Sequence, residues 1–231
     1  MSTIDPLGDG ISSVELLEVL GSDLTVVNAA RVSLDKHSEW QTDNDGLEYL
    51  SFPDKGLIGY LADHNHWTPF GHPQLQFRVK MPIFVAREWF RHTIGFVRNE
   101  VSRRYVDHPP EFWLPDEFRL RAAGIKQGSS SKTHEDSVSI HGRRKLLYAR
   151  ALKEYEYELS VGIAPEVARE LLPQAMYTEF YETASLYAYA RLYQLRISKD
   201  AQRETCAYAE AISSLIEPAF PVSWPALRKD A

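Results

Sequence analysis

A change of pattern at residue 82 constrains the fold more than any other feature of the chain. Residues 73–82, PQLQFRVKMP, alternate apolar and polar side chains, which is the period of a half-buried β-strand. Residues 82–93, PIFVAREWFRHT, begin with a proline, which suits the first turn of a helix. The sequence therefore predicts a strand that is followed at once by a helix.

The remaining predicted elements place strands early and helices late. Residues 13–23 predict a strand and a turn, and helices are expected at 24–36, 54–66, 143–162, 164–173, 178–196 and 200–217. In the helix 143–162 we expect a stripe of Leu146, Ala149, Tyr155 and Leu159, with Gly162 ending the helix. Residues 96–105 are expected to be a loop or strand, and 125–141, which are poor in apolar side chains, a mobile loop. This order predicts an α+β fold in a single domain over residues 1–231.

Composition excludes several classes of protein. The 231 residues, of which 44% are hydrophobic, suffice for the core of one domain. No apolar run has the length of a membrane span, and the acidic, polar start does not resemble a secretory signal, so we expect a cytoplasmic protein without membrane contact. Cys206 is the only cysteine, which excludes an intrachain disulfide and a cysteine metal cluster.

A short basic stretch is the first candidate site. Residues 87–104 hold five arginines and two glutamates, a local charge of +3 in a chain whose formal net charge is −6. Arginine offers a planar fork of donors that matches phosphate or carboxylate, and Asn99 and Ser102 can add neutral hydrogen bonds. The alternative is a set of surface salt bridges with Glu88 and Glu100. The residues alone leave both interpretations open.

Three histidines, His64, His66 and His72, lie close to Asp63. Their spacing matches no zinc signature, so structural or ligand-stacking roles are favoured and no metal is expected. Arginines beside aromatic residues could also bind nucleic acid, but the acidic net charge and the absence of a long basic stripe disfavour it.

The later predicted helices each add arginine: Arg169, Arg191 and Arg196. Single arginines on helices usually lie in solvent, but these three could converge with the basic stretch. The residues then predict a site for one or more phosphorylated small molecules.

Several ordered blocks resemble the flavin-dependent thymidylate synthases. HWTPFGH at 66–72 is similar to the family's His-x-(Ser/Thr)-Pro-Phe-x-His element. PIFVAREWFRHT and NEVSRRY resemble the two halves of its signature, which is Arg-His-Arg, a short spacer and Asn-Glu-x-Ser-x-Arg-Tyr. AARVS at 29–33, GIAPEVARELLP, YTEFY, and LR followed by AQRE resemble its other segments. The resemblance covers most of the chain.

The resemblance implies an α+β homotetramer whose active sites lie between subunits. Such an enzyme binds FAD, is reduced by NADPH, and transfers a carbon from methylenetetrahydrofolate to dUMP to make dTMP. It uses no cysteine nucleophile, with which the isolated Cys206 agrees. The alternative is a non-catalytic relative that binds flavin or nucleotide.

The resemblance also implies roles for individual residues. The implied FAD contacts are His66, Thr68, Arg91, His92, Thr93, Asn99, Glu100, Ser185 and Arg191. The implied dUMP contacts are Glu88, Arg91, Ser102, Arg103, Arg104, Arg169 and Arg196, with Arg196 and Ser102 as the catalytic pair.

The signature departs from the family at several of these positions. Thr93 replaces the second Arg, the spacer between Thr93 and Ser102 is one residue longer, and Glu88 stands where Gln is frequent. A small residue is common in place of Arg103. Ser185 and Tyr187 stand where the family often has Asn and Arg near the flavin, and Arg191 could compensate for the missing Arg.

Overall fold

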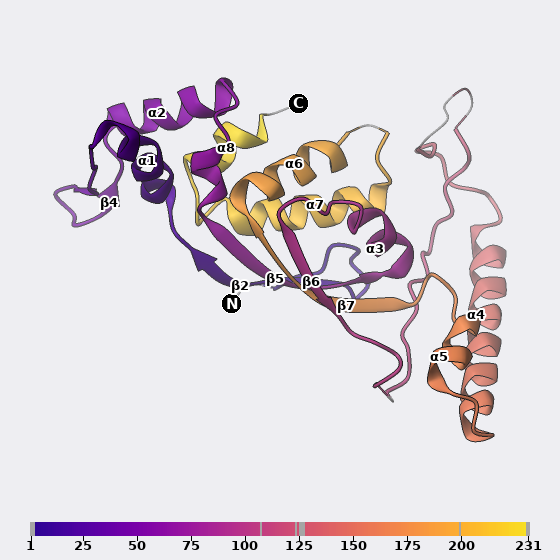
Figure 1. Ribbon diagram of the computed structural model, residues 1–231. Helices are drawn as coiled ribbons and strands as arrows, with labels where there is room; N and C mark the ends of the chain where they lie inside the picture. Colours follow the sequence, from indigo (N-terminus) through magenta and orange to yellow (C-terminus); the bar gives the residue numbers. More distant parts are fainter. Residues whose placement is uncertain (1–2, 107, 123, 125–127, 199, 230–231) are drawn as a thin grey trace.

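The computed structural model describes residues 3–106, 108–122, 124, 128–198 and 200–229. Their main sheet is five-stranded and antiparallel, in the order β1-β2-β5-β7-β6 (Figure 1). Its strands are β1 (Thr3–Ile4), β2 (Ser13–Leu20), β5 (Gln74–Pro82), β7 (Tyr177–Ser185) and β6 (Phe96–Glu100). A small hairpin pairs β3 (Gln41–Thr42) with β4 (Glu48–Tyr49).

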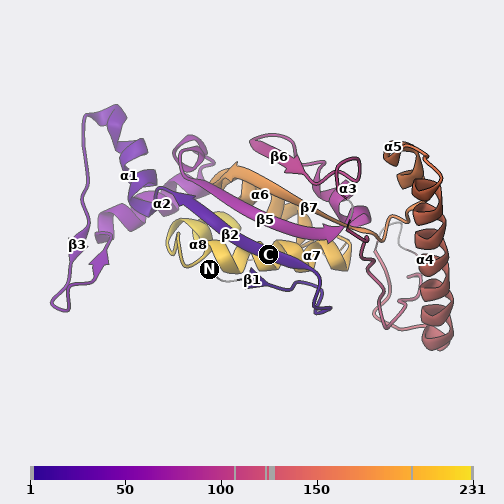
Figure 2. The same cartoon turned by 90° about the horizontal axis from the view of Figure 1, so that it is seen from below.

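Helices cover one face of the sheet. α3 (Ile83–Trp89), α6 (Leu186–Arg196), α7 (Arg203–Ile216) and α8 (Ser223–Arg228) lie above the strands in Figure 1, and β2, β5 and β7 lie in front of α6, α7 and α8 when seen from below in Figure 2. Alternate residues of β5 pack under these helices with no exposed surface, namely Leu75, Phe77, Val79 and Met81. On the opposite face Tyr181 is 48% exposed. The predicted strand at 73–82 is thus the centre of the core.

Two parts extend from this body on opposite sides (Figure 2). One consists of α1 (Asp23–Arg31), the 3₁₀ turn η1 (Val32–Leu34), the β3–β4 hairpin and α2 (Phe52–Asp63), which continues through η2 (Thr68–Gly71) into β5. The other, which we call the arm, consists of α4 (Ser137–Ser160), α5 (Pro165–Ala168) and η3 (Arg169–Leu171). None of the described helices is long and apolar enough to cross a membrane.

The early elements and most of the helices confirm the prediction, but the predicted helix 178–196 is wrong. Its first part is β7, and only Leu186–Arg196 is helical. In β7, alternate side chains face the core, as a strand requires, yet one of them is Glu182. The charged residue at a core position conceals the alternation, and the Ala- and Tyr-rich continuation resembles a helix. The C-terminal half therefore contributes a strand, and is not helical throughout.

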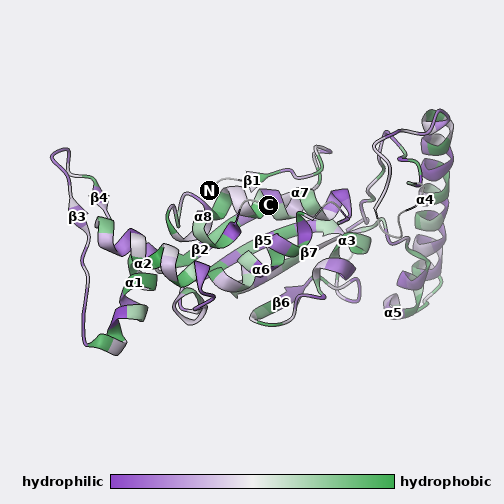
Figure 3. Ribbon diagram, turned by 90° about the horizontal axis from the view of Figure 1, so that it is seen from above, coloured by the Kyte–Doolittle hydropathy of each residue, from purple (hydrophilic) through white to green (hydrophobic). Residues whose placement is uncertain are grey.

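The predicted loop 125–141 differs at its end, because α4 begins at Ser137. Residues 125–127 of that loop lie outside the described residues. Of the expected stripe on α4, Tyr155 is buried, whereas Leu146 is 73% exposed. Figure 3 accordingly shows hydrophobic residues among the hydrophilic ones along this helix. Gly162 follows the helix with a positive φ of 89°, as predicted for its end.

Candidate functional site

The loop between α3 and β6 carries the first half of the basic signature. α3 ends at Trp89, and the loop then turns at Gly95, whose φ is +81°. A Cβ at this position would meet the Ala188 side chain at 3.2 Å, so glycine allows both the turn and the close approach to α6. Arg91, His92 and Thr93 are thereby held against α6.

This arrangement creates a cavity of about 420 Å³. Five residues predicted for the site line it, from two segments distant in sequence: Arg91, His92, Thr93, Arg191 and Arg196. The remaining lining residues are apolar: Ile94, Phe96, Ala188 and Leu195. The structure therefore brings three arginines to one opening with an apolar wall.

Arg196 is fixed at this opening by hydrogen bonds. Its Nε donates to Nε2 of His92 over 2.8 Å. Its Nη1 lies 2.5 Å from Oε1 of Glu88, and its Nη2 donates to the Glu88 backbone carbonyl over 3.1 Å. The other oxygen of Glu88, Oε2, accepts from Oγ1 of Thr205 over 2.9 Å. Glu88 is thus paired with Arg196, which removes most of the repulsion that an unpaired carboxylate would exert on a phosphate.

His92 is neutral at pH 7. Burial lowers its pKa to about 4, and the positive charges of Arg196, Arg98, Arg191 and Arg91 act in the same direction. Because Nε2 accepts the hydrogen bond from Arg196, the proton of the neutral ring is on Nδ1. The histidine therefore serves as an acceptor and adds no charge to the cavity.

Arg98 anchors the loop to the sheet, although the sequence prediction assigned it no role. Its Nη1 donates to the His92 carbonyl over 2.5 Å, and its Nε pairs with Oε2 of the fully buried Glu182. Its guanidinium lies over the rings of Phe90 and Phe96, 5.1 and 4.6 Å from their centroids. The sequence feature that could have pointed to Arg98 is its position in the lengthened spacer between Thr93 and Ser102.

Asn99 and Glu100 lie at a different place. They line a second cavity of about 510 Å³ beside β7, together with Gln76, Tyr181 and Thr183. Glu100 accepts a hydrogen bond from Oγ1 of Thr178 over 2.6 Å. Val97 of the second cavity directly follows Phe96 of the first, but Glu100, at the opposite end of β6, is about 13 Å from Phe96 along the strand.

Ser102, Arg103 and Arg104 follow in a turn that approaches the arm. Nη2 of Arg104 lies 3.2 Å from Oε2 of Glu166 in α5, and both side chains are about half exposed. Burial lowers the pKa of Arg103, whose Nη1 donates to the His108 carbonyl. Arg169 begins η3 with an exposed side chain. Within the basic stretch, Arg104 thus forms a surface salt bridge, but with Glu166 and not with Glu88 or Glu100, and Arg98 pairs with the buried Glu182.

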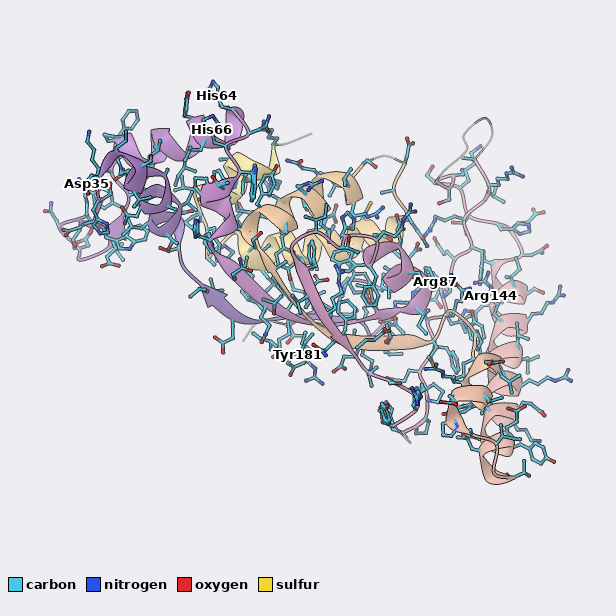
Figure 4. All side chains as sticks on the ribbon, viewed as in Figure 1. Asp35, His64, His66, Arg87, Arg144 and Tyr181 are labelled. Atoms are coloured by element: carbon cyan, nitrogen blue, oxygen red, sulfur yellow. The ribbon has the colours of Figure 1, made fainter. Side chains whose placement is uncertain are left out.

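His66 and Thr68 are exposed and follow α2. His66 lies on the side of the molecule away from Arg87 (Figure 4). His64 stacks on Tyr60 with centroids 4.0 Å apart, and no three metal-binding side chains of the described residues could hold an ion together. Residues around His66 line a cavity of about 100 Å³. Its lining includes Asn65, Trp67, Tyr187 and Arg191.

Arg191 connects this small cavity to the first one, since it lines both. Ser185, at the start of the same helix, caps α6 by accepting the Ala188 N–H over 3.2 Å. The predicted site residues thus form one central group at Arg91, Arg191 and Arg196. Other groups lie near His66, along β6 and at the arm.

The sequence matches the family model described as thymidylate synthase complementing protein over residues 15–222. A flavin-dependent thymidylate synthase of Thermus thermophilus is 36% identical over 227 residues, 98% of this chain and 78% of that protein. A flavin-dependent thymidylate synthase of Thermosipho melanesiensis is also 36% identical, over 94% of this chain and 90% of that protein.

Solved structures agree with these relatives. The UMP/dUMP methylase PolB from Streptomyces cacaoi, bound with 5-Br dUMP, superposes with a TM-score of 0.80 at 31% identity. The match covers 93% of this chain and 94% of that one. The same methylase bound with 5-Br UMP also gives 0.80, at 30% identity.

Proposed function

The chain belongs to the thymidylate synthase complementing protein family, and from this premise we propose that it is an enzyme that methylates dUMP to dTMP. We propose FAD as the cofactor, NADPH as the reductant and methylenetetrahydrofolate as the one-carbon donor. One observation carries the proposal beyond family membership. In an acidic chain, Arg91, Arg191 and Arg196 surround a single cavity with an apolar wall, which suits a planar ring that carries phosphate.

For the nucleotide we propose contacts from Arg91, Ser102, Arg103, Arg104, Arg169 and Arg196, with Glu88 contributing through its pair with Arg196. Arginine forks and a hydroxyl are the groups that bind phosphate well. Arg196 would stabilise negative charge on the uracil carbonyl oxygens, the polarisation that makes C5 nucleophilic towards the one-carbon donor. Ser102 would hold the nucleotide by its hydroxyl.

The residues present also fit a flavin. A dinucleotide cofactor needs cations for its diphosphate and apolar surface for its ring system, and the first cavity offers Arg91 and Arg191 beside Phe96 and Leu195. We propose that His66, Thr68, Arg91, His92, Thr93, Asn99, Glu100, Ser185 and Arg191 hold FAD. When bound, FAD supplies the redox chemistry of the reaction, and the protein supplies orientation and charge.

Cys206 supports a mechanism without a thiol nucleophile. Its Sγ donates to the Arg196 backbone carbonyl over 2.8 Å, and burial raises the pKa of the thiol. An activated cysteine needs a lowered pKa. The thiol therefore stays protonated at neutral pH, and we propose that it takes no part in the reaction.

We further propose a homotetramer in which each active site takes residues from more than one subunit. The support is the distribution of the proposed nucleotide residues within one chain. Arg196 is at the first cavity, whereas Arg104 follows the far end of β6 beside the arm and Arg169 is in the arm itself. A neighbouring copy could bring the second group to the first.

The test is formation of dTMP from dUMP with NADPH, FAD and methylenetetrahydrofolate, with UMP as a parallel substrate. We expect dTMP, and loss of product when any one component is omitted. Flavin or dUMP binding without product would favour the non-catalytic relative. Methylation of UMP alone would overturn the proposed substrate, because the PolB structures contain either nucleotide analogue.

A further inference from the structure

We propose that Thr205 is a positioning residue that acts on substrate binding through Glu88 and Arg196. This inference rests on the proposed function, because it concerns the residue proposed to contact the uracil ring. Thr205 is on α7, has no exposed surface and belongs to none of the predicted site residues. Since it cannot touch a ligand in the cavity, any influence on the ligand passes through its neighbours.

The first step concerns the donors of Arg196. A guanidinium has five N–H groups. The structure engages three of them, with Nε2 of His92, Oε1 of Glu88 and the Glu88 carbonyl. The remaining two belong to Nη1 and Nη2. They are available to a ligand, because Arg196 lines the first cavity.

The second step concerns how Glu88 is held. Its backbone is part of α3, but its side chain has two oxygens that could rotate away from Arg196. Oε1 pairs with Arg196, and Oε2 accepts the Thr205 hydroxyl hydrogen bond over 2.9 Å. This second bond fixes the plane of the carboxylate. The Thr205 hydroxyl, on a different helix, therefore determines where the carboxylate presents Oε1 to Arg196.

The third step is the consequence for binding. Arginine has a long, flexible side chain, and a binding group contributes most when its neighbours hold it in the productive geometry. A guanidinium fixed on three sides loses little freedom when its two remaining donors meet a ligand. Without the Thr205 hydroxyl, the side chains of Glu88 and Arg196 can adopt alternative positions. Binding of dUMP must then restrict them to one position, which lowers the affinity.

The experiment compares Thr205→Val with Thr205→Ser in the full-length protein reconstituted with FAD. Valine keeps the shape but removes the hydroxyl, whereas serine keeps the hydroxyl. By isothermal titration with dUMP we expect Thr205→Val to raise Kd about three- to tenfold, the effect of one lost hydrogen bond, and Thr205→Ser to stay near the parent. Flavin content and melting temperature, measured alongside, show how far valine perturbs the fold.

A second background separates positioning from general loss of structure. With Arg196→Ala already present, Thr205→Val has no guanidinium to misplace, so we expect no further change in dUMP affinity. The same loss in both backgrounds would overturn the inference, as would an unchanged Kd for Thr205→Val alone. A parent protein that does not bind dUMP would instead overturn the proposed function.

Discussion

Arg98 and Glu182 face each other across β6 and β7 as register partners, and their side chains form an ion pair whose carboxylate has no exposed surface. The indole Nε1 of Trp89 donates to the same carboxylate over 3.1 Å. Arg98 also holds the His92 carbonyl, so this buried pair connects the sheet to the loop that carries the central arginines.

The first prediction is that Arg98→Met destabilises the protein strongly. It leaves Glu182 buried without its cation, and burial already raises the pKa of that carboxyl. Breaking a buried pair in this way costs about 3 to 5 kcal/mol of unfolding free energy. The matched control is Arg78→Met, because Arg78 pairs with Glu179 on the open face, where an ion pair contributes about 0 to 1 kcal/mol. Urea unfolding that gives similar losses for both variants would contradict this.

The second prediction concerns pH. The pKa of His92 falls from 6.5 in the unfolded chain to about 4 in the fold, so between these values the unfolded state binds more protons. Stability therefore rises with pH through this window and is lost as the pH falls from 6.5 towards 4. His92→Gln removes the titrating ring but keeps an acceptor for Arg196.

The measurement is the melting temperature of the parent, His92→Gln and a control at the exposed His37 between pH 7 and pH 5, where the ring takes up a proton in the unfolded chain but not in the fold. We expect a shallower decline for His92→Gln than for the parent and for His37→Gln. Equal slopes in all three proteins would show that His92 is protonated normally in the fold.

These two predictions depend on contacts that the sequence could not supply. The sequence predicted β5 because apolar and polar side chains alternate between neighbouring residues along 73–82. β7 was missed because Glu182 occupies a core position, where Arg98 on β6 and Trp89 on α3 make a buried carboxylate tolerable. A partner so far away in sequence leaves no local pattern.

In the candidate site, too, the sequence identified residues but not the contacts that bring them together. The basic stretch identified the Arg91–Thr93 loop, the predicted late helices supplied Arg191 and Arg196, and the resemblance then assigned these residues their roles. That the end of α6 meets this loop is a property of the packed fold. Thr205 carries no motif, and its role follows only from its hydrogen bond to Glu88.

The third prediction is that Arg169→Ala and Arg196→Ala each weaken dUMP binding more than flavin binding. Loss of a charge-assisted hydrogen bond to an anion costs roughly 1.5 to 3 kcal/mol, or about ten- to a hundredfold in Kd. Titrations with dUMP and with FAD on each variant test this. A variant that keeps its dUMP affinity shows that the substituted arginine is not a nucleotide ligand.

The fourth prediction is that two impaired variants restore activity when they assemble together. If each site takes Arg196 from one subunit and Arg169 from another, co-expressed Arg196→Ala and Arg169→Ala chains form some sites in which both arginines are intact. Random pairing of equal amounts gives roughly a quarter of such sites. dTMP formation by the co-purified mixture would support sites between subunits. Activity no higher than that of the separate variants would place both arginines of a site in one chain.

The last prediction is that Cys206→Ala continues to make dTMP at near the parental rate. A nucleophilic cysteine must be available as the thiolate, but burial raises the pKa of Cys206, and the carboxylates of Glu210, Glu88 and Glu204 act in the same direction. The thiol donates to the carbonyl of Arg196, the last residue of α6, so the substitution removes one hydrogen bond and a small contact there. A loss of stability of about 1 kcal/mol is therefore expected. The assay measures dTMP formation by Cys206→Ala beside its FAD content and melting temperature, with Cys206→Ser as the control that restores a donor. A folded, flavin-loaded Cys206→Ala protein that binds dUMP but forms no dTMP would require a thiol-dependent mechanism.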